Sequence, residues 1–140
     1  MARVSIQPIT NEVFTTSLTI RVTDLNYGNH LANQNVLVFA HEARIDFLAS
    51  LGVNELDFYG VSLIQGDAAV VFKSEGFLKD KIEITIGVEE VGNSSFDLVY
   101  FMFNYTTQKP LALVKTGLVC FDYSERKVRP IPKIFKNLFV

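Results

Sequence analysis

The sequence predicts an α+β fold in which one antiparallel sheet of about five strands curls around a single buried helix. Residues 34–51 indicate the helix, because apolar side chains recur around most of its circumference, a pattern typical of a buried helix. Alternating segments on both sides of that helix indicate the sheet, and tight turns join the later segments. Tight turns place consecutive strands side by side and antiparallel. A helix that needs cover on most sides is most economically enclosed by a curled sheet.

The strands are predicted from the alternation of apolar and polar side chains. Residues 14–22 alternate before the helix, and residues 82–89 alternate strictly after it. Residues 96–105 are apolar on both faces, so a second copy of the chain is expected to cover the outer face of the sheet. Further strands are expected over residues 61–77, with Gly66-Asp67 and Gly76 as bulges or bends, and over residues 111–121.

The ends of the helix are predicted from its flanking residues. Asn33 is expected to be the N-cap, and Gly52 is expected to stop the helix. Arg44 projects from the apolar side of the helix, where a charge needs a partner or a route to water. A boundary within the chain, if there is one, is expected after Tyr123, where two prolines end regular pairing.

Length, charge and cysteine content exclude several classes of protein. Residues 1–140 are expected to form one domain, and a net charge of −2 provides no basic field for nucleic acid. No stretch approaches the ~20 apolar residues of a membrane span, and the N-terminal residues do not form a secretory signal. Cys120 is the only cysteine, which favours a reducing, cytoplasmic compartment and buried packing over nucleophilic chemistry. Twelve phenylalanines suggest a large apolar core, an apolar tunnel or a subunit interface.

The segment from Asp24 to Asn33 joins a strand end to the helix start and carries the candidate chemistry. Free backbone N–H groups at a helix start can hold a developing oxyanion. Gly28 would allow the backbone to approach a substrate closely. A carboxylate such as Asp24, or Glu42 in the helix, could attack a thioester carbonyl or deprotonate a water. Beside an apolar core, these groups suit acyl transfer from a substrate with an apolar acyl chain.

This segment resembles the hotdog-fold acyl-CoA thioesterases of the hydroxybenzoyl-CoA type. Their pattern is roughly D-x-D-x-x-G-H-x-N-N, followed by an aliphatic helix with E-x-A-R and a closing glycine. The residues that match it without a gap are Asp24, His30, Asn33, Glu42, Ala43, Arg44 and Gly52. The tail Arg129-Pro130-Ile131-Pro132 is similar to the usual ending of the family. The resemblance implies a hotdog fold, hydrolysis of an acyl-CoA or acyl-carrier-protein thioester without a metal or redox cofactor, and a homo-oligomer, either dimer or tetramer.

The sequence departs from that pattern where the family carries carboxylates. The second aspartate of the family, its usual nucleophile or base, is Asn26 here. A subgroup reads D-M-N-Y-G-G-H-x-G-N-D, in which asparagine is natural at that position, but its last aspartate is Gln34 here and its second glycine is Asn29. Therefore Glu42 or Asp24 does the chemistry, or the chain binds acyl-CoA without hydrolysing it.

Each candidate residue also has a structural interpretation. Glu42 is a general base or an ion-paired helix residue, and Asp24 activates water, caps a turn or pairs with Arg44. His30 orients the substrate or hydrogen-bonds within the loop. The candidate catalytic residues are Glu42, Asp24, Asn26 and His30, and the candidate substrate-binding residues are Tyr27, Gly28, Asn29, Asn33, Gln34 and Phe39.

Two questions remain open at the level of sequence. The phosphates of CoA need cations, and the cluster Arg126, Lys127 and Arg129 is favoured over the scattered Lys73, Lys79 and Lys81. The alternatives to a hydrolase are a module that binds acyl-CoA or another apolar ligand, a purely structural oligomer partner, and a dehydratase, which would need a histidine and a carboxylate across a dimer.

Overall fold

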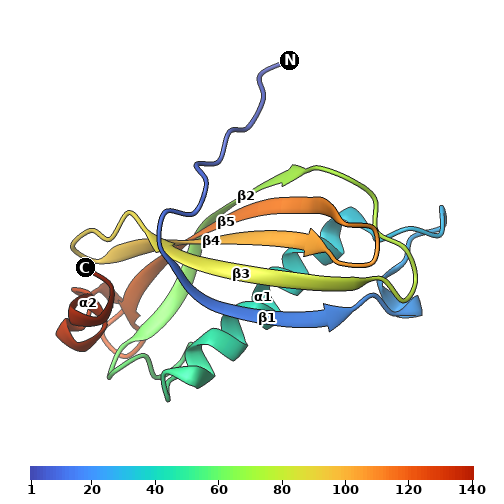
Figure 1. The fold of residues 1–140 in the computed structure, drawn as a ribbon. Coiled ribbons are helices and arrows are strands. Elements are labelled where there is room, and N and C mark those ends of the chain that lie inside the picture. Colours follow the sequence, from blue (N-terminus) through green and yellow to red (C-terminus); the bar gives the residue numbers. More distant parts are fainter.

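The computed structural model describes residues 1–140, and one antiparallel sheet packs against one long helix (Figure 1). The sheet has the strand order β1-β3-β4-β5-β2, and the short β6 pairs with β5. The elements are β1 (Glu12–Thr19), a 3-10 turn (Val22–Asp24), α1 (Asn33–Ser50), β2 (Ser62–Phe72), β3 (Lys81–Glu89), β4 (Ser95–Asn104), β5 (Lys109–Asp122), β6 (Lys127–Val128) and α2 (Lys133–Phe139). The predicted fold class is confirmed, with a sixth strand of two residues beyond the expected five.

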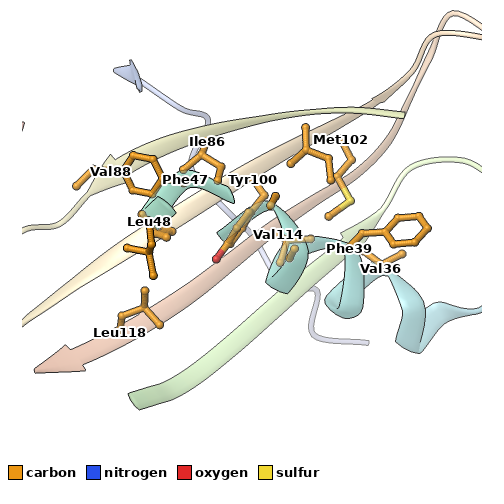
Figure 2. Close-up of a cluster of buried hydrophobic side chains, with 14 of the residues drawn as sticks. Val36, Phe39, Phe47, Leu48, Ile86, Val88, Tyr100, Met102, Val114 and Leu118 are labelled. Carbon is orange, nitrogen blue, oxygen red and sulfur yellow. The ribbon is translucent and has the colours of Figure 1, made fainter. Parts of the chain in front are cut away.

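The core lies between α1 and the inner face of the sheet, and Figure 2 shows side chains of both packed together. The strict alternation of β3 places its four aliphatic residues inward, as predicted. Burial of each such side chain contributes about 1.5–3 kcal/mol to folding. The labelled core residues are Val36, Phe39, Phe47, Leu48, Ile86, Val88, Tyr100, Met102, Val114 and Leu118.

The two ends of α1 are formed differently from each other. The predicted N-cap is wrong, because Ala32 occupies that position and Asn33 is the first helical residue. Ala32 is fixed there by backbone bonds, since its N–H donates to Asp24 O and its carbonyl accepts from Asn35 N, both at 2.9 Å. The predicted stop is confirmed: Gly52 has φ 77°, a left-handed conformation that suits glycine, and its N–H donates to Ala49 O at 2.9 Å.

The prediction that α1 is buried on most sides is wrong for the single chain. The sheet covers one face of the helix, and Leu37, Val38 and Ile45 are exposed on the other. The reason is geometric, because a sheet of this width curls against the helix without closing around it (Figure 1). An exposed apolar helix face of this kind is typical of a surface that another chain covers.

The bulge predicted at Gly66 in β2 is confirmed, and β2 is shorter than the expected strand over residues 61–77. The pairing register of β2 with β5 shifts between Gln65 and Asp67, around Gly66. The strand ends at Phe72, so Gly76 lies in the following turn. A Cβ atom at Gly76 would approach Ile20 Cδ1 to 2.6 Å, so any larger residue there would have to displace the buried Ile20 side chain.

The tail after Tyr123 belongs to the same core, because regular structure resumes in β6 and α2. Proline suits a helix start, and Pro132 is the N-cap of α2. Phe135 of that helix is fully buried, with its ring centroid 4.5 Å from Phe96 and 4.9 Å from Phe58. These three phenylalanines therefore form an aromatic cluster that packs the C-terminal tail against the sheet. No helix is both long enough and apolar enough to span a membrane.

Replacing Phe135 with alanine is expected to lower the free energy of unfolding by about 3–5 kcal/mol, because the change leaves a cavity among aromatic rings. The neighbouring Ile134→Ala is the control, since Ile134 is 59% exposed and its loss should change stability by no more than about 0.5 kcal/mol. Urea unfolding followed by circular dichroism measures both variants. Equal stabilities of the two variants would contradict the placement of the tail in the core.

Candidate functional site

The segment between β1 and α1 folds as a narrow loop that returns to the helix start. Leu25 and Leu31 form an isolated antiparallel bridge, and the N–H of Asn26 donates to His30 O at 2.9 Å. These bonds bring the start of the loop beside the first turn of α1. The predicted site residues of this loop therefore lie at the N-terminal end of α1. The loop itself extends beyond the end of the sheet (Figure 1).

Asp24 is buried, and the chain occupies both of its carboxylate oxygens. Oδ2 accepts the backbone N–H of Arg21 at 2.8 Å, and Oδ1 accepts the side-chain amide of Asn35 at 3.0 Å. The guanidinium of Arg21 lies 3.7 Å from Oδ2. These contacts join the end of β1 to the first turn of α1. The geometry is that of a structural cap, and Arg44 is not among its partners.

The tip of the loop is a tight turn closed by a side chain. Asn26 Oδ1 accepts the N–H of Gly28 at 2.9 Å, which closes a tight turn. Tyr27 is fully exposed, and Asn29 has φ 63°. Gln34 is exposed on the first turn of the helix. Tyr27, Asn29 and Gln34, three of the candidate binding residues, are thus exposed, whereas Asn26 is half-buried.

Glu42 lies at a cavity of about 260 Å³ between β1 and α1. Its carboxylate makes no hydrogen bond and no ion pair within the chain, unlike that of Asp24 in the same cavity. Phe39, a predicted binding residue, lines the same space. The other lining residues are Leu18, Thr19, Arg21 and Val38. The cavity thus combines an unpaired carboxylate with walls that are in part apolar.

A second cavity, of about 300 Å³, lies at the start of α1 on the side of β2. His30 and Asn33 line it together with Lys73 and Ser74. The backbone N–H groups of Asn33 and Gln34 have no acceptor within the chain, and no side chain caps the helix. Such free donors, at the positive end of an 18-residue helix, can bind an anion or an oxyanion.

The structure therefore divides the predicted site residues into two groups. Asp24, Phe39 and Glu42 line the first cavity, and His30 and Asn33 line the second. Asn33 and Glu42 are nine residues apart on α1, which is about 13 Å along the helix axis at ~1.5 Å per residue. One thioester carbonyl cannot lie beside both of them.

Arg44 has a set of partners that the sequence did not reveal. It is buried, and its guanidinium lies 3.2 Å from each of three oxygens. Burial raises the pKa of the Tyr100 phenol, which keeps it a neutral hydroxyl partner. The three oxygens belong to Glu55, Gln65 and Tyr100. No spacing pattern links these three residues, since they come from a loop and two different strands.

Cys120 is buried in β5, as its expected packing role requires. Burial raises the pKa of its thiol to about 11, so the thiolate is scarce at neutral pH. This thiol is therefore no nucleophile for the site.

Comparisons with known proteins agree on one family. A family model described as the thioesterase-like superfamily matches residues 20–139. A relative named 1,4-dihydroxy-2-naphthoyl-CoA hydrolase, from Thermosynechococcus vestitus, is 28% identical over 117 residues, which are 81% of this chain and 80% of the relative.

Two solved structures show the same fold. A 1,4-dihydroxy-2-naphthoyl-CoA thioesterase from Synechocystis has a TM-score of 0.80 at 20% identity, covering 89% of this chain and 93% of its own. A Staphylococcus aureus protein in complex with CoA has a TM-score of 0.79 at 15% identity, covering 95% of this chain and 84% of its own.

Proposed function

This chain belongs to the thioesterase-like superfamily and has its hotdog fold, and from that premise we propose that it hydrolyses an acyl-CoA thioester to the free acid and CoA. The observation that carries the proposal is the unpaired carboxylate of Glu42 at the mouth of a partly apolar cavity. The relative that acts on 1,4-dihydroxy-2-naphthoyl-CoA makes a fused aromatic acyl group the first substrate to test. An acyl-carrier-protein thioester is the other substrate of the same chemistry.

In the proposed reaction, Glu42 acts as the general base. Its carboxylate takes a proton from a water whose oxygen attacks the thioester carbonyl carbon. The carbon–sulfur bond of the resulting tetrahedral intermediate then breaks. The proton held by Glu42 passes to the departing thiolate, so the carboxylate is restored and no cofactor is consumed.

The free N–H groups of Asn33 and Gln34 are proposed to hold the oxyanion of that intermediate. Because these groups and Glu42 of one helix lie too far apart to share a carbonyl, the complete site requires a second copy of the chain. That copy would bring its helix start beside Glu42 of its neighbour. His30 then lies beside the oxyanion, where it orients the substrate.

Two surfaces support such a homo-oligomer, a dimer or a tetramer. The 11-residue strand β2 lies at one edge of the sheet, with backbone groups that no strand of this chain pairs. Long unpaired edges favour pairing with another chain. The exposed Leu37, Val38 and Ile45 of α1 provide an apolar face that this chain leaves uncovered. Sedimentation equilibrium would measure the assembly, and a monomer at working concentrations would contradict a shared site.

Release of free thiol from a panel of acyl-CoAs tests the proposed function. The panel contains aliphatic chains of several lengths, benzoyl-CoA, phenylacetyl-CoA and 1,4-dihydroxy-2-naphthoyl-CoA. Turnover of one member or more is the expected result. Intact thioester after long incubation with stoichiometric folded protein would favour the alternative, a binding protein, which the neutral Asn26 and Gln34 support.

Replacing Asp24 with asparagine distinguishes a positioning role from a catalytic one. Its two carboxylate contacts fix the loop, so the change is expected to lower stability by about 1–3 kcal/mol, the cost of disturbing buried hydrogen bonds. The expected loss of kcat is less than about tenfold, because the oxygens are already occupied. Steady-state kinetics and urea unfolding measure the two effects, and a loss of kcat beyond about a hundredfold at unchanged stability would make Asp24 the base.

A further inference from the structure

Asn35 fixes the start of α1 to the buried Asp24. Its side-chain amide donates to Asp24 Oδ1 at 3.0 Å, and its backbone N–H donates to Ala32 O at 2.9 Å. The N–H of Ala32 donates in turn to Asp24 O at 2.9 Å. Asp24, Ala32 and Asn35 thus form a closed ring of three hydrogen bonds, which we call the helix-start clasp.

The part of the helix-start clasp to which Asn35 is bonded has little freedom to move. Asp24 is buried, and its Oδ2 accepts the backbone N–H of Arg21 at 2.8 Å. Ala32 is buried as well. Buried polar groups whose hydrogen bonds are satisfied hold a unique arrangement. Asn35 therefore joins the helix to a fixed part of the chain.

The first turn of α1 has few other contacts that hold it. Asn33 and Gln34 are exposed, and their N–H groups have no acceptor within the chain. Val36 is the residue of this turn whose side chain lies in the core. The bond from Asn35 to Asp24 is the only side-chain hydrogen bond that the turn makes. Because a helix end without a capping side chain unwinds easily, loss of this bond would let the free N–H groups move.

The placement of those N–H groups matters for the proposed reaction. The second cavity is lined by Asn33 and also by Glu75, which is exposed. The carboxylate of Glu75 disfavours a further negative charge nearby. Hydrogen bonds weaken steeply when their geometry is poor. An oxyanion beside Glu75 is therefore stabilised only by donors that are held in line with the oxygen as its charge develops.

Resting on the proposed acyl-CoA hydrolysis, we propose that Asn35 is a positioning residue of that reaction. Through the helix-start clasp it holds the N–H groups of Asn33 and Gln34 in the orientation that stabilises the oxyanion, and it touches no reacting atom itself. The full negative charge is present only once the tetrahedral intermediate forms. A misaligned first turn therefore lowers kcat more than it raises KM.

Removing the bond, and then restoring it with donor and acceptor exchanged, tests this role. Asn35→Leu keeps a branched side chain without the donor, and Asn35→Asp places a second carboxylate against Asp24. At about pH 8, where the two carboxylates repel each other, each variant is expected to lower kcat for thiol release by at least about tenfold and to change KM by less than about threefold.

The double variant D24N/N35D exchanges donor and acceptor. The introduced amide accepts the N–H of Arg21 and donates to the introduced carboxylate, so its kcat is expected to return to within about threefold of the parent. A double variant as slow as Asn35→Asp would overturn the positioning role. Asp24→Asn alone keeps a bond, because the Asn35 amide can turn and accept an N–H of the new side chain.

Ser50→Ala is the matched control, because it removes a side-chain hydrogen bond at the other end of α1. Ser50 Oγ donates to Phe47 O at 2.6 Å. The kcat of this variant is expected to stay within about twofold of the parent. Thermal melting establishes that each variant is folded at the assay temperature. A lower melting temperature of Asn35→Leu with unchanged kcat and KM would make the role of Asn35 purely structural.

Binding of two ligands that cannot be hydrolysed separates this inference from the proposed function. S-trifluoroacetonyl-CoA adds water at its ketone and presents a tetrahedral carbon, whereas S-acetonyl-CoA remains a ketone. By isothermal titration calorimetry, the parent is expected to bind the first at least about tenfold more tightly than the second. Asn35→Leu is expected to lose most of that preference, and Ser50→Ala is expected to keep it.

The outcomes for the two proposals differ. Thiol release and ligand preference that are both unchanged by Asn35→Leu would overturn the positioning role and leave the hydrolase intact. A preference for the tetrahedral ligand that depends on Asn35, without thiol release from any acyl-CoA, would support the positioning role and contradict hydrolysis. Absence of both thiol release and ligand preference in the parent would contradict both proposals.

Discussion

Glu42→Gln is expected to lower kcat for thioester hydrolysis by at least about a hundredfold, the usual contribution of a general base. The amide has nearly the same size, and the Glu42 carboxylate makes no hydrogen bond or ion pair within the chain, so no polar interaction is lost. KM should change little, because the substrate carbonyl is held by backbone N–H groups. Initial rates of thiol release against acyl-CoA concentration give both constants.

Asp46→Asn is the matched control for that change. Asp46 lies one helical turn beyond Glu42, is exposed, and its carboxylate accepts Thr16 Oγ1 at 3.2 Å. The same loss of one negative charge on α1 is expected to leave kcat within about twofold, as for a surface charge. If both variants retain turnover within a few-fold of the parent, Glu42 is not the base.

Much of the fold could be predicted because the strands and the helix obey their own periodicities. The period of two in β3 depends only on which face meets the core, and each of its inward residues is buried. Gly52 could be recognised because few other residues adopt its conformation at a helix end. Such features depend only on residues that are close together in the chain, so they can be recognised in a single sequence.

The missed features depend on contacts between distant segments. The seven residues of α2 have no clear amphipathic repeat, and the helix is held by rings from β4 and the loop before β2. The exposed face of α1 could not be predicted either. The apolar residue pattern of a helix is the same whether a sheet of its own chain or a second chain covers it.

In the candidate site, too, the residues could be predicted from the sequence but their contacts with distant segments could not. Sequence matching found Asp24, His30 and Glu42, but it could not show that Asp24 is saturated with hydrogen bonds while Glu42 is free. Neither could it show that Arg129 pairs with Asp122 and Glu125. These distinctions arise from pairing registers that bring remote residues together.

Arg44→Ala is expected to lower the free energy of unfolding by about 3–5 kcal/mol, because it truncates a large buried side chain and removes the donor of three hydrogen bonds. The change leaves the partly exposed Glu55 carboxylate with His41 as its remaining ion-pair partner, the Tyr100 hydroxyl with Thr116, and the Gln65 oxygen without a donor. The unpaired, exposed Arg126 gives the control Arg126→Ala, which should change stability by no more than about 0.5 kcal/mol. Urea unfolding curves measure each variant.

The double variant Arg44→Met with Glu55→Gln shows whether the loss comes from an unpaired charge. Methionine fills much of the space of arginine, and glutamine removes the charge that would otherwise lack its buried partner. Replacement of a buried ion pair by neutral groups of similar volume is often close to neutral. We therefore expect the double variant to recover at least about 2 kcal/mol relative to Arg44→Ala. A double variant as unstable as Arg44→Ala would instead assign the loss to the contacts with Gln65 and Tyr100, which join α1 to β2 and β4.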